Sequence, residues 1–181
     1  MDKYRPLLQE IESQWPIHIH RGLAELVRQH PGEVFYAGAF WILYCDYTNI
    51  ATPTFGVNAE STLEDEGDRW APAEWRWDVV KTVNDEMEPF YEKLSAALAG
   101  APNEEWEAVM AANEELIGRV SRAVTKSARS KSGAFGDLPL PNNFLVFAGD
   151  VREDAATYNR QLRLSVDEAL LPTLGMLAPE E

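Results

Sequence analysis

Three tryptophans and a glutamate lie close together in the middle of the chain. Trp70, Trp75 and Trp77 flank Pro72 and Glu74. Aromatic rings carry much of the free energy at protein interfaces, and a carboxylate among them can receive a basic group. The same rings could instead close the hydrophobic core beneath the neighbouring acidic segment. The sequence leaves both interpretations open.

A polar segment precedes the tryptophans and supplies further candidate binding groups. Its carboxylates are Glu60, Glu64, Asp65, Glu66 and Asp68. Oxygen ligands of this kind could hold a hard cation, but the regular ligand spacing and central glycine of a calcium loop are absent. A solvated acidic loop is therefore the favoured interpretation. We predict a binding surface, without a metal or a catalytic residue, made of Asn58, Glu60, Trp70, Glu74 and Trp75.

Histidine and cysteine could supply metal ligands or a nucleophile, but their number and spacing are unfavourable. His18 and His20 lie near a predicted helix, and only His30 is left to complete a site with them. Cys45 is the single cysteine, and no basic residue lies near it in sequence to activate its thiol. No glycine-rich phosphate-binding motif is present. We expect no cofactor.

The charge balance restricts the class of partner. The chain carries 16 Lys and Arg against 30 Asp and Glu, a formal net charge of −14. Such a field repels nucleic acids and anionic lipid headgroups and attracts basic proteins. We therefore expect no nucleic-acid or membrane partner, and a basic protein as the favoured one. The single cysteine and a polar N-terminus without an apolar signal core favour a cytoplasmic location.

Apolar spacing predicts helices and a hairpin in the first third of the chain. A helix from Asp2 should end or kink at Pro16, and a second short helix should follow it. Residues 34–44 lack helical periodicity, and residues 50–57 contain Pro53, which favours an outer strand. The two segments predict an antiparallel hairpin over residues 34–57.

Helices dominate the rest of the sequence. Apolar spacing predicts one helix over residues 72–99 and another over 104–130, followed by a strand over 144–148 and a last helix capped by Asp154. This order lacks the strict strand–helix alternation of a doubly wound sheet. The predicted class is α+β, with a small, mainly antiparallel sheet (hairpin 34–57 plus strand 144–148) packed against several long helices in a single domain over residues 1–181.

Three short motifs carry a family resemblance. They are Phe-Tyr-Ala-Gly-Ala-Phe at 35–40, Asn-Ala-Glu at 58–60 and Arg-Trp-Ala-Pro-Ala-Glu-Trp at 69–75. With the strand over 144–148 and the helix after it, they resemble a bacterial domain family of unknown function catalogued as number 4303. Ala59 stands where that family tends to have a small hydroxyl residue. The resemblance implies no activity and no catalytic residue. Small acidic bacterial proteins of this kind suggest, by analogy, immunity or partner-binding proteins.

Two classes of function fit these observations. The leading hypothesis is a non-enzymatic protein-binding module, such as an immunity protein that covers a basic toxin. The alternative is a small-ligand-binding protein or enzyme whose pocket draws on Asn58, Glu60, Glu74 and Asp150. A homodimer with a scaffolding role is a third hypothesis. A deep pocket that gathers those side chains would favour the alternative over the binding module.

Overall fold

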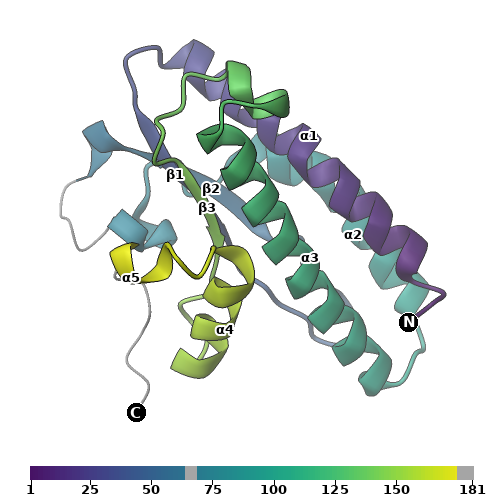
Figure 1. The fold of residues 1–181 in the computed structure, drawn as a ribbon. Coiled ribbons are helices and arrows are strands. Elements are labelled where there is room, and N and C mark those ends of the chain that lie inside the picture. Colours follow the sequence, from purple (N-terminus) through teal and green to yellow (C-terminus); the bar gives the residue numbers. More distant parts are fainter. Residues whose placement is uncertain (64–68, 175–181) are drawn as a thin grey trace.

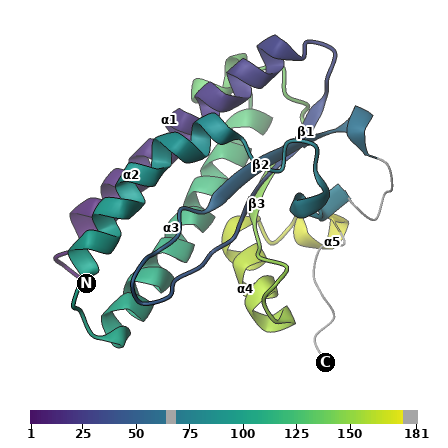
Figure 2. The same ribbon diagram turned by 180° about the vertical axis from the view of Figure 1, so that it is seen from behind.

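A small sheet separates two layers of helices. The computed structural model describes residues 1–63 and 69–174. The long helices are α1 (Arg5–Gln29), α2 (Lys81–Leu98) and α3 (Asn103–Arg129). They lie together on one face of the sheet (Figure 1), and Figure 2 shows the same arrangement from behind. The opposite face, which we call the outer face, is covered by the 3-10 helix η3 (Pro72–Glu74), α4 (Ala155–Ser165) and α5 (Leu171–Leu174).

The sheet has three strands, in the order β2 (Thr54–Ala59), β1 (Phe35–Trp41) and β3 (Leu145–Ala148). β1 pairs antiparallel with β2 and parallel with β3. The α+β class is confirmed, and the outer position of β2 agrees with Pro53 just before it. The sheet is mixed and not purely antiparallel, because β3 joins β1 in the parallel direction. Because α2 and α3 carry the chain out and back, β3 starts at the same end of the sheet as β1.

Helix α1 is longer than the sequence predicts. It runs through Pro16 without ending, so the predicted break between two helices is wrong. A proline removes one intrahelical hydrogen bond, but the buried side chains before and after it lie on one continuous face. These residues are Leu8, Ile11, Trp15, Ile19 and Leu23. Burial of that stripe against the sheet and α2 keeps the helix in one piece.

Helix α2 starts at Lys81 and not at Pro72. Trp75 is 4% exposed and belongs to the core on the outer face of the sheet. The carbonyl oxygen of Trp77 accepts the N–H of Val57 in β2 at 2.8 Å. The N–H of Val80 also donates to the carbonyl oxygen of Phe55 at 2.8 Å, so backbone bonds to β2 hold residues 75–80 in a non-helical conformation despite their helical spacing. The other predicted elements agree with the structure, including the cap of α4, where Asp154 accepts the N–H of Thr157.

A buried chain of hydrogen bonds joins the three long helices. Trp15 Nε1 donates to the hydroxyl of Tyr91 at 3.1 Å, and that hydroxyl donates to Asn113 Oδ1 at 2.9 Å. Burial raises the pKa of Tyr91 far above its usual value, so the phenol stays protonated and can donate. None of the helices in residues 1–63 and 69–174 is at once long and apolar enough to cross a membrane.

Candidate functional site

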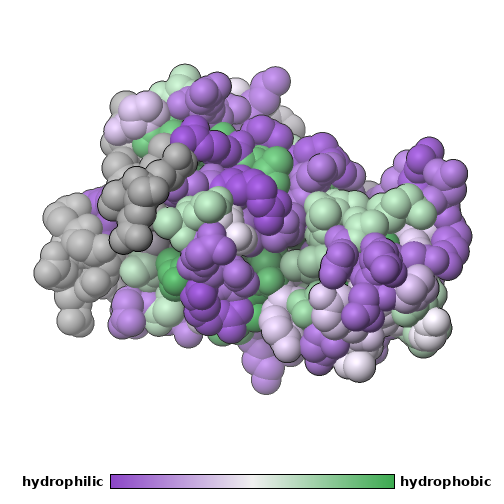
Figure 3. Space-filling model, turned by 90° about the horizontal axis from the view of Figure 1, so that it is seen from below, coloured by the Kyte–Doolittle hydropathy of each residue, from purple (hydrophilic) through white to green (hydrophobic). Residues whose placement is uncertain are grey.

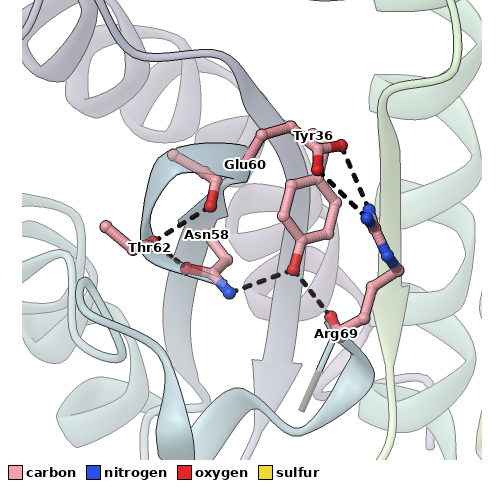
Figure 4. Close-up of polar contacts among 6 residues, drawn as sticks. Tyr36, Asn58, Glu60, Thr62 and Arg69 are labelled. Atoms are coloured by element: carbon pink, nitrogen blue, oxygen red, sulfur yellow. Dashed lines mark hydrogen bonds and ion pairs between the residues drawn. The ribbon is translucent and has the colours of Figure 1, made fainter. Parts of the chain in front are cut away.

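Asn58 lies in β2 opposite Ala37 and is 2% exposed. Its Nδ2 donates to the hydroxyl of Tyr36 at 3.0 Å, and its Oδ1 accepts the hydroxyl of Thr62 at 2.8 Å. The Tyr36 hydroxyl in turn donates to the carbonyl oxygen of Arg69 at 2.9 Å. Figure 4 shows this network. Asn58 therefore ties both ends of the segment between residues 59 and 70 to the sheet.

Glu60 and Arg69 form a two-point ion pair above the same tyrosine. Arg69 donates from both terminal nitrogens to the two oxygens of Glu60, at 3.1 and 3.0 Å (Figure 4). The guanidinium carbon lies 4.7 Å from the centre of the Tyr36 ring, within the range of a cation–π contact. Glu60 remains partly open to solvent beside this pair.

Trp70 and Trp75 pack edge-on against Phe147 of β3, with ring centres 6.1 and 6.0 Å away. Trp70 also meets the Tyr36 ring at 5.9 Å. The structure thus supports the core interpretation for Trp75, whereas Trp70 is half-buried. Because these rings touch β1 and β3 together, they fix the segment after residue 69 on the outer face of the sheet.

Glu74 ends η3 on the surface, and its carboxylate has no partner among the described residues. The structure therefore brings Asn58, Glu60, Trp70 and Trp75 together and leaves Glu74 exposed beside them. The predicted acidic loop is described only in part, because Glu64, Asp65, Glu66 and Asp68 lie outside the described residues.

Asp150 lies at a different place from the Asn58 network. It follows β3, is fully buried, and accepts the N–H of Leu43 at 3.3 Å beyond the end of β1. Arg152 donates to both of its carboxylate oxygens. Burial alone would raise the pKa of Asp150, but the hydrogen bonds from Arg152 and the Leu43 backbone outweigh it and lower the pKa. The carboxylate is thus charged and structural.

The histidines are used in packing. His18 pairs through Nδ1 with Glu86 of α2, and the His20 ring meets Phe135 edge-on at 5.5 Å. Within the described ranges, no group of three or more His, Cys, Asp or Glu side chains is arranged to hold a metal ion.

A second group of carboxylates lies outside the predicted surface. Asp85, Glu88 and Glu92 of α2 face residues 49–52 across a hollow of about 440 Å³, which we call the acidic hollow. None of the three carboxylates pairs with a cation in the described part of the chain. Their spacing of three and four residues places them on one helix face, so the sequence does contain the signal that could have revealed them.

The chain matches no family model, no curated protein and no solved structure. The resemblance to domain family number 4303 therefore stays a hypothesis carried by its three short motifs.

Proposed function

We propose that this protein is a non-enzymatic module that binds a basic protein partner. The observation that carries the proposal is the acidic hollow, where Asp85, Glu88 and Glu92 line one cavity and pair with no Lys or Arg among residues 1–63 and 69–174. Like charges at this helical spacing repel one another. A lysine or arginine side chain that enters the hollow would relieve this repulsion, since it would pair with carboxylates that have no cationic partner in the described part of the chain.

The charge of the whole chain supports the same proposal. A net charge of −14 attracts a basic protein over a long range and speeds its encounter with the hollow. Glu60 and Glu74 are also reachable from solvent on the outer face of the sheet and could add to the contact. An immunity protein that covers a basic toxin in the cytoplasm is the specific form of this proposal.

Binding of a defined basic probe tests the proposal. The probe is a short peptide of alternating arginine and glycine, and its affinity is measured by calorimetry at about 0.15 M ionic strength. We expect the triple variant Asp85→Asn, Glu88→Gln, Glu92→Gln to bind at least about ten-fold more weakly than the wild type.

A matched control separates the hollow from net charge. Asp137→Asn, Asp167→Asn and Glu168→Gln remove the same charge from exposed positions elsewhere, and this variant should keep its affinity within about two-fold. Equal losses in the two variants, or a wild type that does not bind the peptide, would overturn the proposed site.

A further inference from the structure

A second cavity lies at the carboxyl ends of the parallel strands β1 and β3. It has a volume of about 500 Å³, within the size range of small-molecule pockets. Its lining comes from the loop after β1 (residues 43–47), the first half of α3 and the start of α4. Crevices outside the carboxyl ends of parallel strands are common ligand sites in α/β proteins. Figure 3 shows this end of the molecule from below, with apolar patches between polar ones.

Buried polar side chains connect the elements around this cavity. The Asp150 N–H donates to Gln161 Oε1 at 2.9 Å, and Gln161 Nε2 donates to Glu114 Oε1 at 3.1 Å. Arg160 donates to the other oxygen of Glu114 at 2.6 Å. Together with the bond from Leu43 to Asp150, these contacts join β1, β3, α3 and α4. These contacts fix the elements around the cavity relative to one another, as a preorganised site requires.

The loop that forms one wall has an unusual backbone. Ile42 and Tyr47 both have positive φ angles, 61° and 63°. A branched residue such as Ile42 rarely adopts this conformation, and strained backbone of this kind clusters at functional sites. The loop presents Tyr44 and Tyr47, which are 51% and 44% exposed. Two aromatic rings thus stand at the cavity without being covered by the protein's own core.

The charges around the cavity determine which ligand it fits. Glu114 is neutralised by Arg160. Glu107 accepts the hydroxyl of Tyr47 at 3.0 Å and has no ion pair in the described part of the chain. Glu153, which also lines the cavity, has no ion pair there either. The net charge of the side chains around the cavity is therefore negative. Carboxylates beside tyrosine rings are the groups that recognise organic cations.

We propose that this cavity, the amine pocket, binds a small organic cation with an apolar body. The ammonium group lies against Glu107 and Glu153, and the apolar part packs on Tyr44 and Met110. An anionic ligand would meet the excess negative charge, and a neutral one would leave both carboxylates without a counter-charge. A free amine and a lysine side chain of a peptide share this chemistry, and the experiment compares them.

Cys45 provides a reporter for the test, because it lines the cavity and is the single cysteine of the chain. The labelling rate of Cys45 by iodoacetamide is measured at neutral pH with 2-phenylethylamine, 2-phenylethanol or 3-phenylpropionate. We expect the amine to slow labelling about five-fold or more at millimolar concentration, and the neutral and anionic analogues to have little effect. Equal protection by the alcohol, or no protection by the amine or by the peptide described below, would overturn the proposal.

Variants locate the cation within the pocket. Glu107→Gln with Glu153→Gln should abolish protection by the amine. Glu104→Gln with Asp167→Asn removes the same charge from exposed residues that do not line the cavity and should preserve protection. Circular dichroism confirms that each variant is folded. If the Glu107 and Glu153 variant keeps full protection, the assigned contacts are wrong.

The final arm separates the two sources of the cation. Acetyl-Phe-Lys-amide should protect Cys45 less than 2-phenylethylamine if the ligand is a free amine, and more if it is a segment of a protein. Either order supports the cation site. The variant of Asp85, Glu88 and Glu92 should be protected like the wild type, so failure of the amine pocket is distinguishable from failure of the acidic hollow.

Discussion

Buried polar side chains at single positions hold distant parts of this chain together. Asn58 is the clearest case, because it satisfies hydroxyl groups from β1 and from the start of the next segment. We expect Asn58→Ala to lower the free energy of unfolding by about 1–3 kcal/mol, since the hydrogen bonds to Tyr36 and Thr62 are lost in a buried site. Urea denaturation measures the change.

The neighbouring surface residue is the control for this substitution. Glu74→Ala removes a side chain that has no partner in the described chain, so the free energy of unfolding should change by less than about 0.5 kcal/mol. If Asn58→Ala is equally mild, the network does not hold the segment, and a direct ligand role for Asn58 becomes the better explanation.

Asp150 gives stability a specific dependence on pH. The pKa of Asp150 is lower in the folded state than its unfolded value of about 3.9. The carboxylate therefore contributes fully to the free energy of unfolding above about pH 3.9, and this contribution is lost as the pH falls through the folded-state pKa. We expect Asp150→Asn to lower the free energy of unfolding by about 1–3 kcal/mol at pH 7. The gap between this variant and the wild type should narrow below about pH 4.

Chemical denaturation across this pH range measures that gap. Asp137→Asn alters an exposed carboxylate and should differ from the wild type by less than about 0.5 kcal/mol. A gap for Asp150→Asn that stays constant down to pH 2 would show that ionisation of this carboxylate does not contribute to folding.

The sequence predicted that Asn58, Trp70 and Trp75 belong to one region, but not which residues they contact. Trp75 and Asn58 were recognisable from residue type and from their place around one polar segment. Their partners, Phe147 and Tyr36, lie on other strands, so spacing along the chain holds no information about them. The cavity that we call the amine pocket could not be predicted from the sequence for the same reason, because residues 43–47 and two helices distant in sequence line it.

Among the secondary-structure elements, tertiary packing overrode the local sequence preference at two prolines, one expected to break a helix and one expected to start a helix. Pro16 lies inside α1, where the buried stripe continues on both sides of it, and Pro72 starts a 3-10 turn although helical spacing follows it. Both outcomes depend on burial against the sheet, which local propensity does not contain. The long α3, β3 and α4 were predictable because their periodicity and packing agree.

The packing of residues 75–80 on β2 depends on a close approach at Gly56. A Cβ atom there would lie 2.3 Å from the carbonyl oxygen of Asp78, which is backbone and cannot turn away. We expect Gly56→Ala to lower the free energy of unfolding by about 2 kcal/mol or more. Thermal and urea unfolding measure the loss.

Gly32 is the matched control, because a Cβ at that position meets nothing within 4 Å. Gly32→Ala should leave stability unchanged or raise it by up to about 1 kcal/mol, through the lower entropy of the unfolded chain. Similar effects at both glycines would mean that residues 75–80 can move away from β2 at little cost.

At the scale of the whole molecule, the net charge of −14 works against folding, because like charges repel more strongly in the compact state. Asp85, Glu88 and Glu92 concentrate this repulsion on one helix face. We expect their triple neutralisation to raise the free energy of unfolding by about 0.4–1 kcal/mol at low salt, as two like-charge pairs are removed. The gain should shrink at about 0.5 M NaCl.

Urea denaturation at both salt concentrations tests this, with the variant of Asp137, Asp167 and Glu168 as the control of equal net charge. If the free energy of unfolding rises in the variant of the acidic hollow and not in the control, the carboxylates of the hollow lower the stability of the folded protein. Side chains retained at a cost to folding are best explained by a role outside folding, and the role that we propose for these carboxylates is the binding of a basic partner. If neutralising the hollow instead destabilises the protein, these carboxylates belong to the fold, and the argument for a partner loses its strongest support.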